Sequence, residues 1–121
     1  MTTQEVSQML EGIGLPYAYD HFTKDDTPGG PPFICFVYPD SDNFSADGRV
    51  YQRVTSLDVE LYTDEKDIAL ERAVEETLDA AGLYYESHET YLESERMYMV
   101  RWETEILLTA DRIDKTCKEE E

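Results

Sequence analysis

An α+β fold is expected for this chain of 121 residues, because its strand patterns occur in runs that are flanked by helix patterns. The order along the chain is helix, strand, strand, strand, helix, strand, strand, which lacks the regular alternation of parallel α/β folds. We therefore expect a mostly antiparallel sheet of about four to five strands, with two helices packed on one face. Residues 1–110 form a single domain, and residues 111–121 form a polar, flexible tail.

The first helix is predicted over residues 2–13. Thr2 and Glu5 have the spacing of a capping box, in which two side chains satisfy backbone N–H groups at the start of a helix. Gly12 and Gly14 favour termination, and Pro16 prevents the helix from continuing. The apolar residues recur every three or four positions, as in an amphipathic helix: Val6, Met9, Leu10 and Ile13.

Three strands separated by two loops are expected next. Residues 17–22 are extended, and residues 23–32 are rich in proline and glycine, which favour a loop. Residues 33–38 are apolar on both alternating faces, which is typical of a central strand that is covered on both sides. Residues 40–48 form a second polar loop. Residues 49–62 form a long half-buried strand, with Tyr51, Leu57, Val59 and Leu61 on one face and Gln52, Ser56, Asp58 and Glu60 on the other.

The second helix has the strongest pattern in the chain. Asp64 is the expected N-cap, Glu65 and Asp67 place negative charge in the first turn, and Gly82 ends the helix. The apolar stripe consists of Ile68, Leu70, Ala73, Val74, Thr77, Leu78 and Ala81. The acidic residues of the other side are interpreted as a solvated face: Glu71, Glu75, Glu76 and Asp79.

The last two strands are predicted to form an antiparallel hairpin over residues 83–93 and 97–109, with a turn at Ser94 and Glu95. Apolar and polar residues alternate along the second of these strands. One face carries Tyr98, Val100, Trp102, Ile106 and Leu108, and the other carries Arg101, Glu103 and Glu105.

The charge balance limits the classes of partner. The chain has 10 Lys and Arg against 28 Asp and Glu, a formal charge of −18 and a pI near 4.2. Nucleic acids and anionic membranes are polyanions that bind proteins mainly through Lys and Arg, so specific binding to either is not expected. No segment resembles a signal peptide or a membrane span, which predicts a cytosolic protein. Partners should be neutral, basic, or further copies of the chain.

Candidate chemistry is sparse, and we expect no enzyme activity, cofactor or metal. The acidic residues of the loop at 40–48 lack the ligand spacing of a calcium-binding EF-hand. His21 and His88 are the only imidazoles, fewer than a zinc site with nitrogen ligands needs. Cys35 lies in an apolar run and Cys117 in a charged tail, so both are treated as thiols, and Cys35 as an inert buried one.

The tyrosines are the most informative residues for an interface. Tyr is amphipathic and is enriched where proteins meet. Four tyrosines in the last two strands cannot all enter one small core, so some are expected at a surface: Tyr84, Tyr85, Tyr91 and Tyr98. The alternative is that they are ordinary sheet residues whose hydroxyl groups face water.

The layout of the elements resembles that of the tail-terminator and tail-completion proteins of long-tailed bacteriophages and prophages. The resemblance covers roughly residues 1–109. It lies in the leading helix, the proline-bounded apolar strand, the final hairpin, and the passage from the alternating strand at 54–62 into the helix that ends in Leu78-Asp-Ala-Ala-Gly82.

This resemblance implies a structural virion subunit that assembles as a ring, commonly a hexamer, at the head-proximal end of the tail. There it would stop the tail tube from growing and join the tail to the head connector. The implied partners are further copies of the chain, the tail tube protein and the head-connector protein. The implied locations are the cytoplasm of the bacterial host during assembly and the tail of the virion. The family carries no catalytic motif, so no residue inherits an active-site role.

Loops are the expected points of contact in such a ring. The loops at 23–32 and 40–48 are predicted to project from the sheet toward neighbouring subunits or the tube. Within the second loop, the candidate contact residues are Asp40, Asp42 and Phe44.

Two other functions fit the composition. An acidic inhibitor or DNA mimic would use carboxylates in place of phosphates to occupy the basic cleft of a nucleic-acid-binding protein. An adaptor domain would dock a host partner through the exposed tyrosines. A mimic should bind basic proteins with a steep dependence on salt, whereas a ring subunit should bind itself or the tube.

Overall fold

The computed structural model describes residues 1–22, 29–39, 44–46, 49–52 and 54–107. Side chains are described for all of these ranges except 44–46 and 49–52. The helices and strands are α1 (Thr3–Glu11), β1 (Tyr17–Tyr19), β2 (Phe33–Val37), β3 (Phe44–Ala46), β4 (Arg49–Gln52), β5 (Val54–Thr63), α2 (Ile68–Ala80), β6 (Tyr85–Leu92) and β7 (Met97–Leu107).

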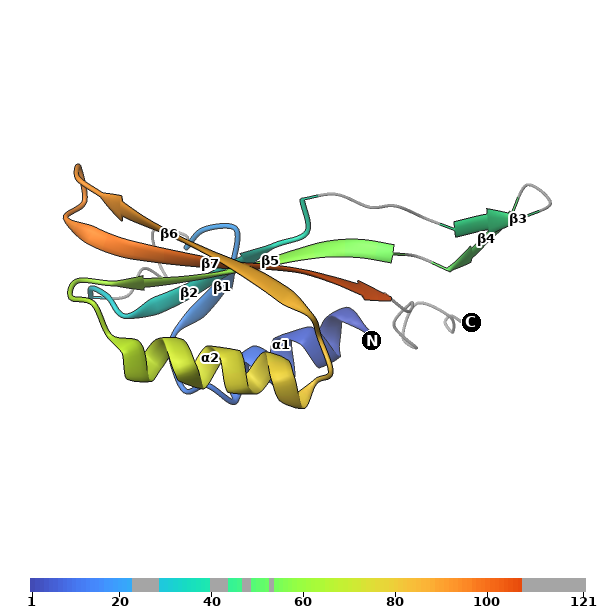
Figure 1. Ribbon diagram of the computed structural model, residues 1–121, viewed down its shortest axis with the longest axis horizontal. Coiled ribbons are helices and arrows are strands. Elements are labelled where there is room, and N and C mark those ends of the chain that lie inside the picture. The colour runs from blue at the N-terminus through green and yellow to red at the C-terminus, as the bar shows by residue number, and fades with distance from the viewer. Residues whose placement is uncertain (23–28, 40–43, 47–48, 53, 108–121) are drawn as a thin grey trace.

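Five of the strands form one sheet in the order β1, β2, β5, β7, β6. β1 and β2 are parallel, and the other neighbouring pairs are antiparallel. Both helices pack on the same face of this sheet, and no helix of the described residues covers the opposite face (Figure 1). The predicted α+β class and element order are therefore confirmed, and the one parallel pair makes the sheet mixed.

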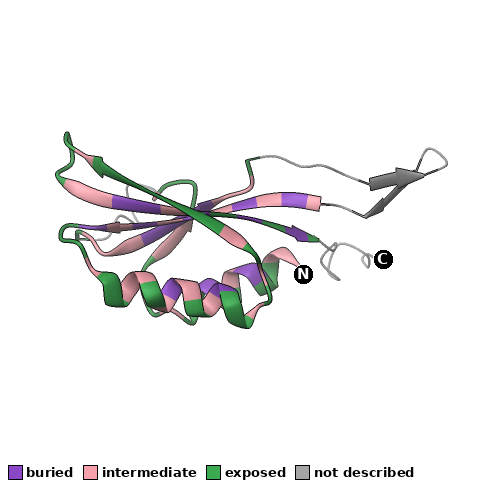
Figure 2. Ribbon diagram, in the orientation of Figure 1, coloured by how far each residue is buried: buried purple, intermediate pink, exposed green. Residues whose placement is uncertain are grey.

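The hydrophobic core lies between the helices and the sheet (Figure 2). Trp102 of β7 is fully buried, and its indole Nε1 donates a hydrogen bond to Glu75 Oε2 of α2 at 3.0 Å. Glu75 therefore belongs to the packing of the helix against the sheet, and the prediction that places it on a solvated face is wrong. The other large side chains that are fully buried in the described part of the chain are Val6, Leu10, Ile34, Leu57, Val59, Leu61, Val74 and Leu78.

Both ends of the first helix are formed by the residues that its sequence predicts. The Thr2 hydroxyl accepts from the Glu5 backbone N–H at 3.1 Å, and the Glu5 carboxylate accepts from the Thr2 backbone N–H at 2.8 Å. These two bonds complete the capping box. Gly12 is the C-cap, and Gly14 has a φ of 92°, a left-handed conformation that glycine adopts without strain.

The second helix begins three residues later than expected. Asp67, rather than Asp64, is the N-cap, and its Oδ1 accepts from the Leu70 backbone N–H at 3.1 Å. Strand β5 extends through Thr63, so residues 64–66 are needed to turn the chain from the sheet toward the helix layer. Two aspartates with the same capping chemistry compete here, and only Asp67 follows the completed turn.

The apolar stripe of α2 is narrower than expected. Ile68 is 63% exposed, because it lies about 200° around the helix from Leu70 and faces away from the sheet. Val74 and Leu78 are the buried residues of the stripe. At the other end Gly82 has a φ of 76°, and the Leu83 N–H donates to the Leu78 carbonyl at 3.1 Å. This pattern is a Schellman motif, so the predicted end at Gly82 is confirmed.

The strand prediction for residues 49–62 is right in type but wrong in continuity. The structure divides this segment into β4 and β5, and β4 pairs with β3 in a separate two-stranded sheet beyond one end of β5 (Figure 1). The loop expected at 40–48 consequently contains the short strand β3. The first strand is also shorter than expected, ending at Tyr19. Alternation alone does not reveal where a strand changes partners.

The final hairpin is confirmed. Strands β6 and β7 pair antiparallel from Tyr85 opposite Thr104 to Leu92 opposite Met97, with residues 93–96 as the turn.

Neither helix in the described part of the chain has the length and apolarity that crossing a membrane requires. The polar tail predicted at 111–121 and Leu108 lie outside the described residues.

Candidate functional site

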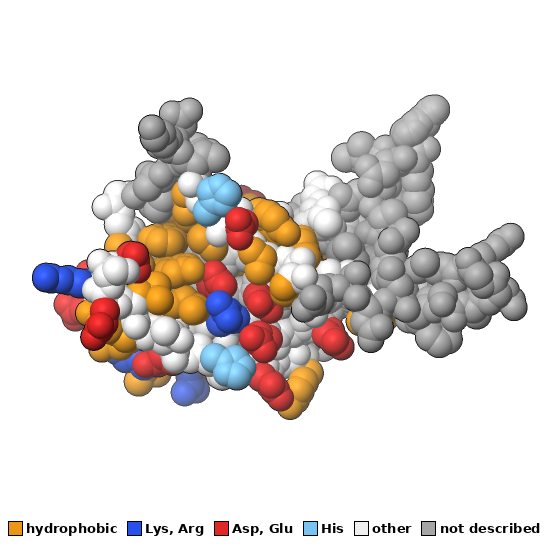
Figure 3. Space-filling model, turned by 90° about the horizontal axis from the view of Figure 1, so that it is seen from above, with side chains coloured by type: hydrophobic (Ala, Val, Ile, Leu, Met, Phe, Trp, Pro, Cys, Tyr) orange, Lys and Arg blue, Asp and Glu red, His pale blue; other side chains and the backbone are white. Residues whose placement is uncertain are grey.

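The sheet face opposite the helices, here called the open face, holds two grooves, one lined mainly by acidic and one mainly by apolar side chains. Its residues follow from the strand registers, because successive side chains of a strand point to opposite faces. The residues that alternate with the core positions form rows across neighbouring strands. Figure 3 views this face and shows hydrophobic side chains gathered at one end of it and acidic side chains beside them.

The apolar end of the open face forms a groove of about 430 Å³, here called the apolar groove. Phe33 stacks on Tyr62 with a centroid distance of 5.0 Å, and Phe22 meets Phe33 edge-on at 5.4 Å. Leu92 and Met97 complete it from the β6–β7 hairpin. The remaining lining residues are Asp20, His21, Cys35 and Glu95.

Cys35 lies in the apolar groove with 5% of its surface exposed. Burial, with smaller contributions from the charges of Glu60 and Asp20, raises the pKa of its thiol from 9.0 to about 11. A thiol that stays protonated is a poor nucleophile and a poor metal ligand. The expectation of an inert thiol at Cys35 therefore agrees with its surroundings, and Cys117 lies outside the described residues.

The middle of the open face is a charge-paired row. Arg101 Nε of β7 lies 3.2 Å from Glu60 Oε2 of β5, and the Tyr62 hydroxyl donates to Glu60 Oε1 at 2.8 Å. Burial and this bond to Glu60 raise the pKa of Tyr62 above its ordinary value. Because Glu60 has both a cation and a hydroxyl donor, its negative charge is well compensated.

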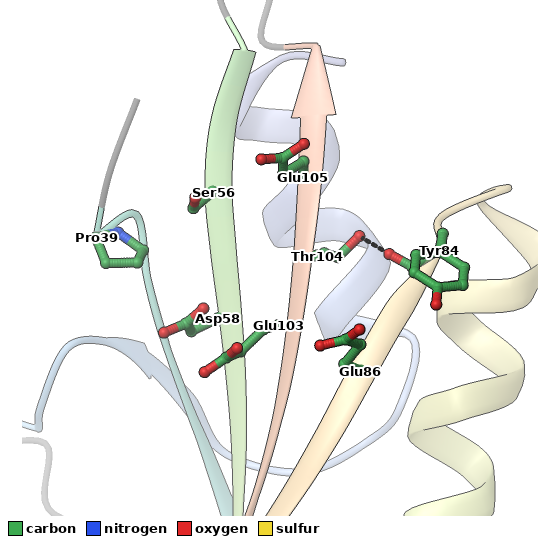
Figure 4. Close-up of a pocket in the computed structure, with 8 residues that line it drawn as sticks. All are labelled: Pro39, Ser56, Asp58, Tyr84, Glu86, Glu103, Thr104 and Glu105. Carbon is green, nitrogen blue, oxygen red and sulfur yellow. Dashed lines mark hydrogen bonds between the residues drawn. The ribbon is translucent and has the colours of Figure 1, made fainter. Parts of the chain in front are cut away.

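The next row is acidic and is here called the acidic row. Asp58 of β5 lies opposite Glu103 of β7, and Glu103 lies opposite Glu86 of β6, so three carboxylates adjoin across three strands. Together with Glu105 and Tyr84 they line a groove of about 630 Å³, here called the acidic groove (Figure 4). His88 Nε2 lies 3.5 Å from Glu103 Oε1 at one side of the row. Glu86 and Glu103 are exposed, so this part of the row faces solvent.

The predicted contact tyrosines separate into three settings. Tyr84 is 82% exposed at the edge of the acidic groove, and its carbonyl accepts from the Thr104 hydroxyl. Tyr85 packs against the core. Tyr91, which is 47% exposed, meets Tyr98 edge-on at a centroid distance of 4.9 Å. The structure thus places Tyr84 and Tyr91 at the surface without bringing all four tyrosines together, and their contact with a partner stays a prediction.

The candidate contact residues of the loop at 40–48 lie largely outside the described residues. Asp40 and Asp42 are not among the described residues, and for Phe44 only its backbone position in β3 is described. Among the residues that the structure describes, no three His, Cys, Asp or Glu side chains come together in a group that could hold a metal ion.

The open face itself was missed at the sequence level. The available signal was the second, non-core face of the alternating strands, where Phe33, Tyr62 and Met97 line one groove although they are distant in sequence. The acidic row is equally invisible in the chain, because Asp58, Glu86 and Glu103 come together only through strand pairing.

Comparison with known proteins gives a match in structure and none in sequence. No protein-family model matches the chain, and no curated protein matches it in sequence. Among solved structures, it is similar to a chain described as "Virion of native gene transfer agent (GTA) particle". The TM-score is 0.62 at 15% sequence identity, and the match covers 88% of this chain and 95% of that chain. The two chains share a fold. Because the match covers most of both chains, the similarity concerns the overall fold.

Proposed function

We propose that this chain is a structural subunit of a phage-like virion, acting as a tail terminator or tail-completion protein. The observation that carries the proposal is the near-complete match of its fold to a chain from a gene transfer agent virion. The element order, which resembles that of the tail-terminator family, agrees with this proposal. In this role the chain has no catalytic step, assembles in the cytoplasm of a bacterial host, and remains in the virion tail.

The proposed assembly is a ring of about six copies between the tail tube and the head connector. Six copies at −18 each carry a formal charge of −108, so contacts between subunits must be mainly apolar or must place the few Lys and Arg against carboxylates. Salt screens repulsion beyond about 10 Å at 0.1 M, so the ring should become more stable as salt is added. An acidic lumen would let DNA pass without binding it.

Tube growth provides the test of this function. Purified tail tube protein from the same genome is polymerised with and without the chain, and tube lengths and tips are measured by electron microscopy. We expect shorter tubes with a ring at one end when the chain is present. Tubes of unchanged length with bare ends would contradict a terminator role.

The loops at 23–32 and 40–48 are proposed to make the contacts with the tube or with neighbouring subunits. A variant that lacks most of residues 40–48 should keep the fold, because β3 and β4 lie outside the five-stranded sheet. It should lose the ability to cap tubes. Capping that survives this deletion would remove the loop from the proposal.

A second function, an acidic mimic of nucleic acid, is favoured by the acidic row of the open face. Such a protein would bind DNA-binding proteins in competition with DNA, and the binding would weaken steeply with salt. Displacement of DNA from a basic nuclease or repressor by the purified chain, without any capping of tubes, would favour this function over the first.

A further inference from the structure

The two edges of the five-stranded sheet differ in length. β1 forms one edge with three residues, and β6 forms the other with eight. β6 pairs with β7 in a continuous register, and none of the described strands pairs with its outer side. Its sequence contains no proline, lysine or arginine. Edge strands commonly carry such residues or a bulge, because a long regular edge recruits another strand.

The side chains of the β6 edge are polar in the middle and aromatic at the ends. Residues 86–90 are all exposed. Tyr84, just before the strand, is 82% exposed, and Tyr91, near its end, is 47% exposed. On the helix side, Glu89 forms an ion pair with Lys66. Tyrosine is enriched where proteins meet, so the ends of this edge have the composition of a contact surface.

Length selects the strand that fits beside β6. β1, β3 and β4 have three or four residues, so any of them would leave at least half of the eight residues of β6 unpaired. β2, β5 and β7 each lie between two other strands of the sheet. Among the described strands, β6 of a second copy is therefore the one that matches this edge in length and is accessible to it.

Charge selects the register of two such strands. A twofold axis perpendicular to the sheet makes them antiparallel and places one residue opposite its own copy. Two registers of this kind pair all but one of the eight residues. Centring on Glu89 sets the two Glu89 carboxylates opposite each other, which destabilises a sheet. Centring on His88 sets Glu86 opposite Thr90 and Ser87 opposite Glu89, so no two carboxylates are opposed.

The register centred on His88 also pairs the residues at the ends of the strand. Tyr85 lies opposite Tyr91 of the second copy, and Tyr84 lies opposite Leu92. Cross-strand pairs of aromatic side chains stabilise a sheet, and the twofold axis gives each pair twice. At the centre, Nε2 of each His88 lies 3.5 Å from Glu103 Oε1 of its own copy, so each imidazole is accompanied by a carboxylate.

We propose that two copies of the chain join their sheets edge to edge through antiparallel β6 strands, with His88 opposite His88 at the twofold axis. Because each copy carries a formal charge of −18, pairing should strengthen as salt screens the repulsion. This inference goes beyond the proposed function. The loop at 23–32, which is proposed to contact the tube or a neighbour in the ring, connects β1 to β2, and these strands form the other edge of the sheet.

Cysteine cross-linking tests the register. A Cys117→Ser background leaves the buried Cys35 as the native thiol, and His88→Cys then places two thiols opposite each other. Opposed Cα atoms of antiparallel strands are about 4.5 to 5.5 Å apart, which is within the range of a disulfide. Under mild oxidation with copper phenanthroline at high salt, we expect a disulfide-linked dimer on a non-reducing gel.

The matched control is Glu89→Cys in the same background, because position 89 is also exposed and adjoins His88. In the proposed register the two residues at 89 have Cα atoms about 8 Å apart, beyond the range of a disulfide, so cross-linking should be at least about tenfold slower. Glu89→Cys also removes a negative charge, which favours random collisions. Equal rates at the two positions, faster cross-linking at 89, or no cross-linking at 88 would overturn the inference.

Amide hydrogen exchange tests the pairing in the unaltered chain. As the protein concentration is raised at high salt, exchange in residues 85–92 should slow by at least about tenfold, because the outer amides of β6 become hydrogen-bonded. His88→Lys should abolish this effect by opposing two cations, whereas Glu76→Gln, an equal change in net charge at an exposed position of α2, should retain it. Exchange in β5 and β7 verifies that both variants keep the fold.

Two results of this experiment would overturn the inference. One is exchange in residues 85–92 that does not depend on protein concentration in the unaltered chain. The other is the same concentration dependence in His88→Lys as in Glu76→Gln. Neither cross-linking at position 88 nor exchange in β6 measures the capping of tubes, so failure here and failure of the proposed function remain distinguishable.

Discussion

The two faces of the same sheet are built for different purposes. On the helix-covered face, residues of β5 and β7 such as Val59 and Trp102 are fully buried under α1 and α2. On the open face, the alternate residues of the same strands include the opposed carboxylates of Asp58 and Glu103. The covered face supplies the buried apolar contacts, whereas the open face carries exposed carboxylates beside an apolar groove. An apolar groove on a face that no described helix covers indicates a surface that meets something else.

The largest difference in stability between the two faces should come from substitution of a core residue. Trp102→Ala removes a fully buried indole, and we expect it to lower the free energy of unfolding by about 3 to 5 kcal/mol. Met97→Ala, a truncation on the open face, should cost about 1 kcal/mol, because Met97 is only half-buried. Urea unfolding followed by circular dichroism measures both. Equal costs would contradict the division of roles between the faces.

The protonation of Cys35 tests how far the apolar groove shields this thiol from water. Its folded pKa is raised from 9.0 to about 11, so between these pH values the unfolded thiol loses its proton while the folded one keeps it. The free energy of unfolding should therefore fall as pH rises from 9 to 11, by about 2 kcal/mol from this group. The fall should be smaller in Cys35→Ala. The same pH dependence in both proteins would show that Cys35 is not the source.

Glu75 tests the polar contact between helix and sheet. Glu75→Ala leaves the buried Trp102 N–H without its acceptor, and we expect a loss of about 1 to 2 kcal/mol in the free energy of unfolding. Glu75→Gln retains an acceptor oxygen and should cost less. If alanine and glutamine cost the same, the hydrogen bond contributes nothing specific.

The ion pair of the open face should have the smallest effect. Arg101→Gln removes the cation beside Glu60, and because the arginine side chain is 37% exposed we expect a cost below about 1 kcal/mol. High salt should reduce the difference between the two proteins further. A cost above that of Glu75→Ala would contradict the view that the covered face alone holds the main stabilising contacts.

Much of the fold is readable from the sequence because local signals agree with one another. The Thr2 and Glu5 capping box and the glycine at 82 each act within one turn of their helix, so their sequence spacing is their spatial spacing. The choice between Asp64 and Asp67 was missed because both can cap a helix, and only the length of β5 decides between them.

The candidate site was less predictable because it is assembled from distant strands. The prediction selected Tyr84, Tyr85, Tyr91 and Tyr98 because four tyrosines in two neighbouring strands cannot all enter one small core, yet exposure differs widely among them. The row formed by Asp58, Glu86 and Glu103 depends on which strands pair and in which register. Alternation identified the faces of β5 and β7, but it contains no information about their neighbours.

The native mass of the purified chain in solution tests the central claim, that it is a self-assembling structural subunit, most directly. Light scattering at low and high salt should show a closed ring of about six copies that forms or becomes more stable as salt screens the charge of −18 per subunit. E103K/E105K should form the ring at lower salt, because it reduces that charge. A monomer at both salt concentrations, or an assembly that dissociates as salt rises, would contradict the account.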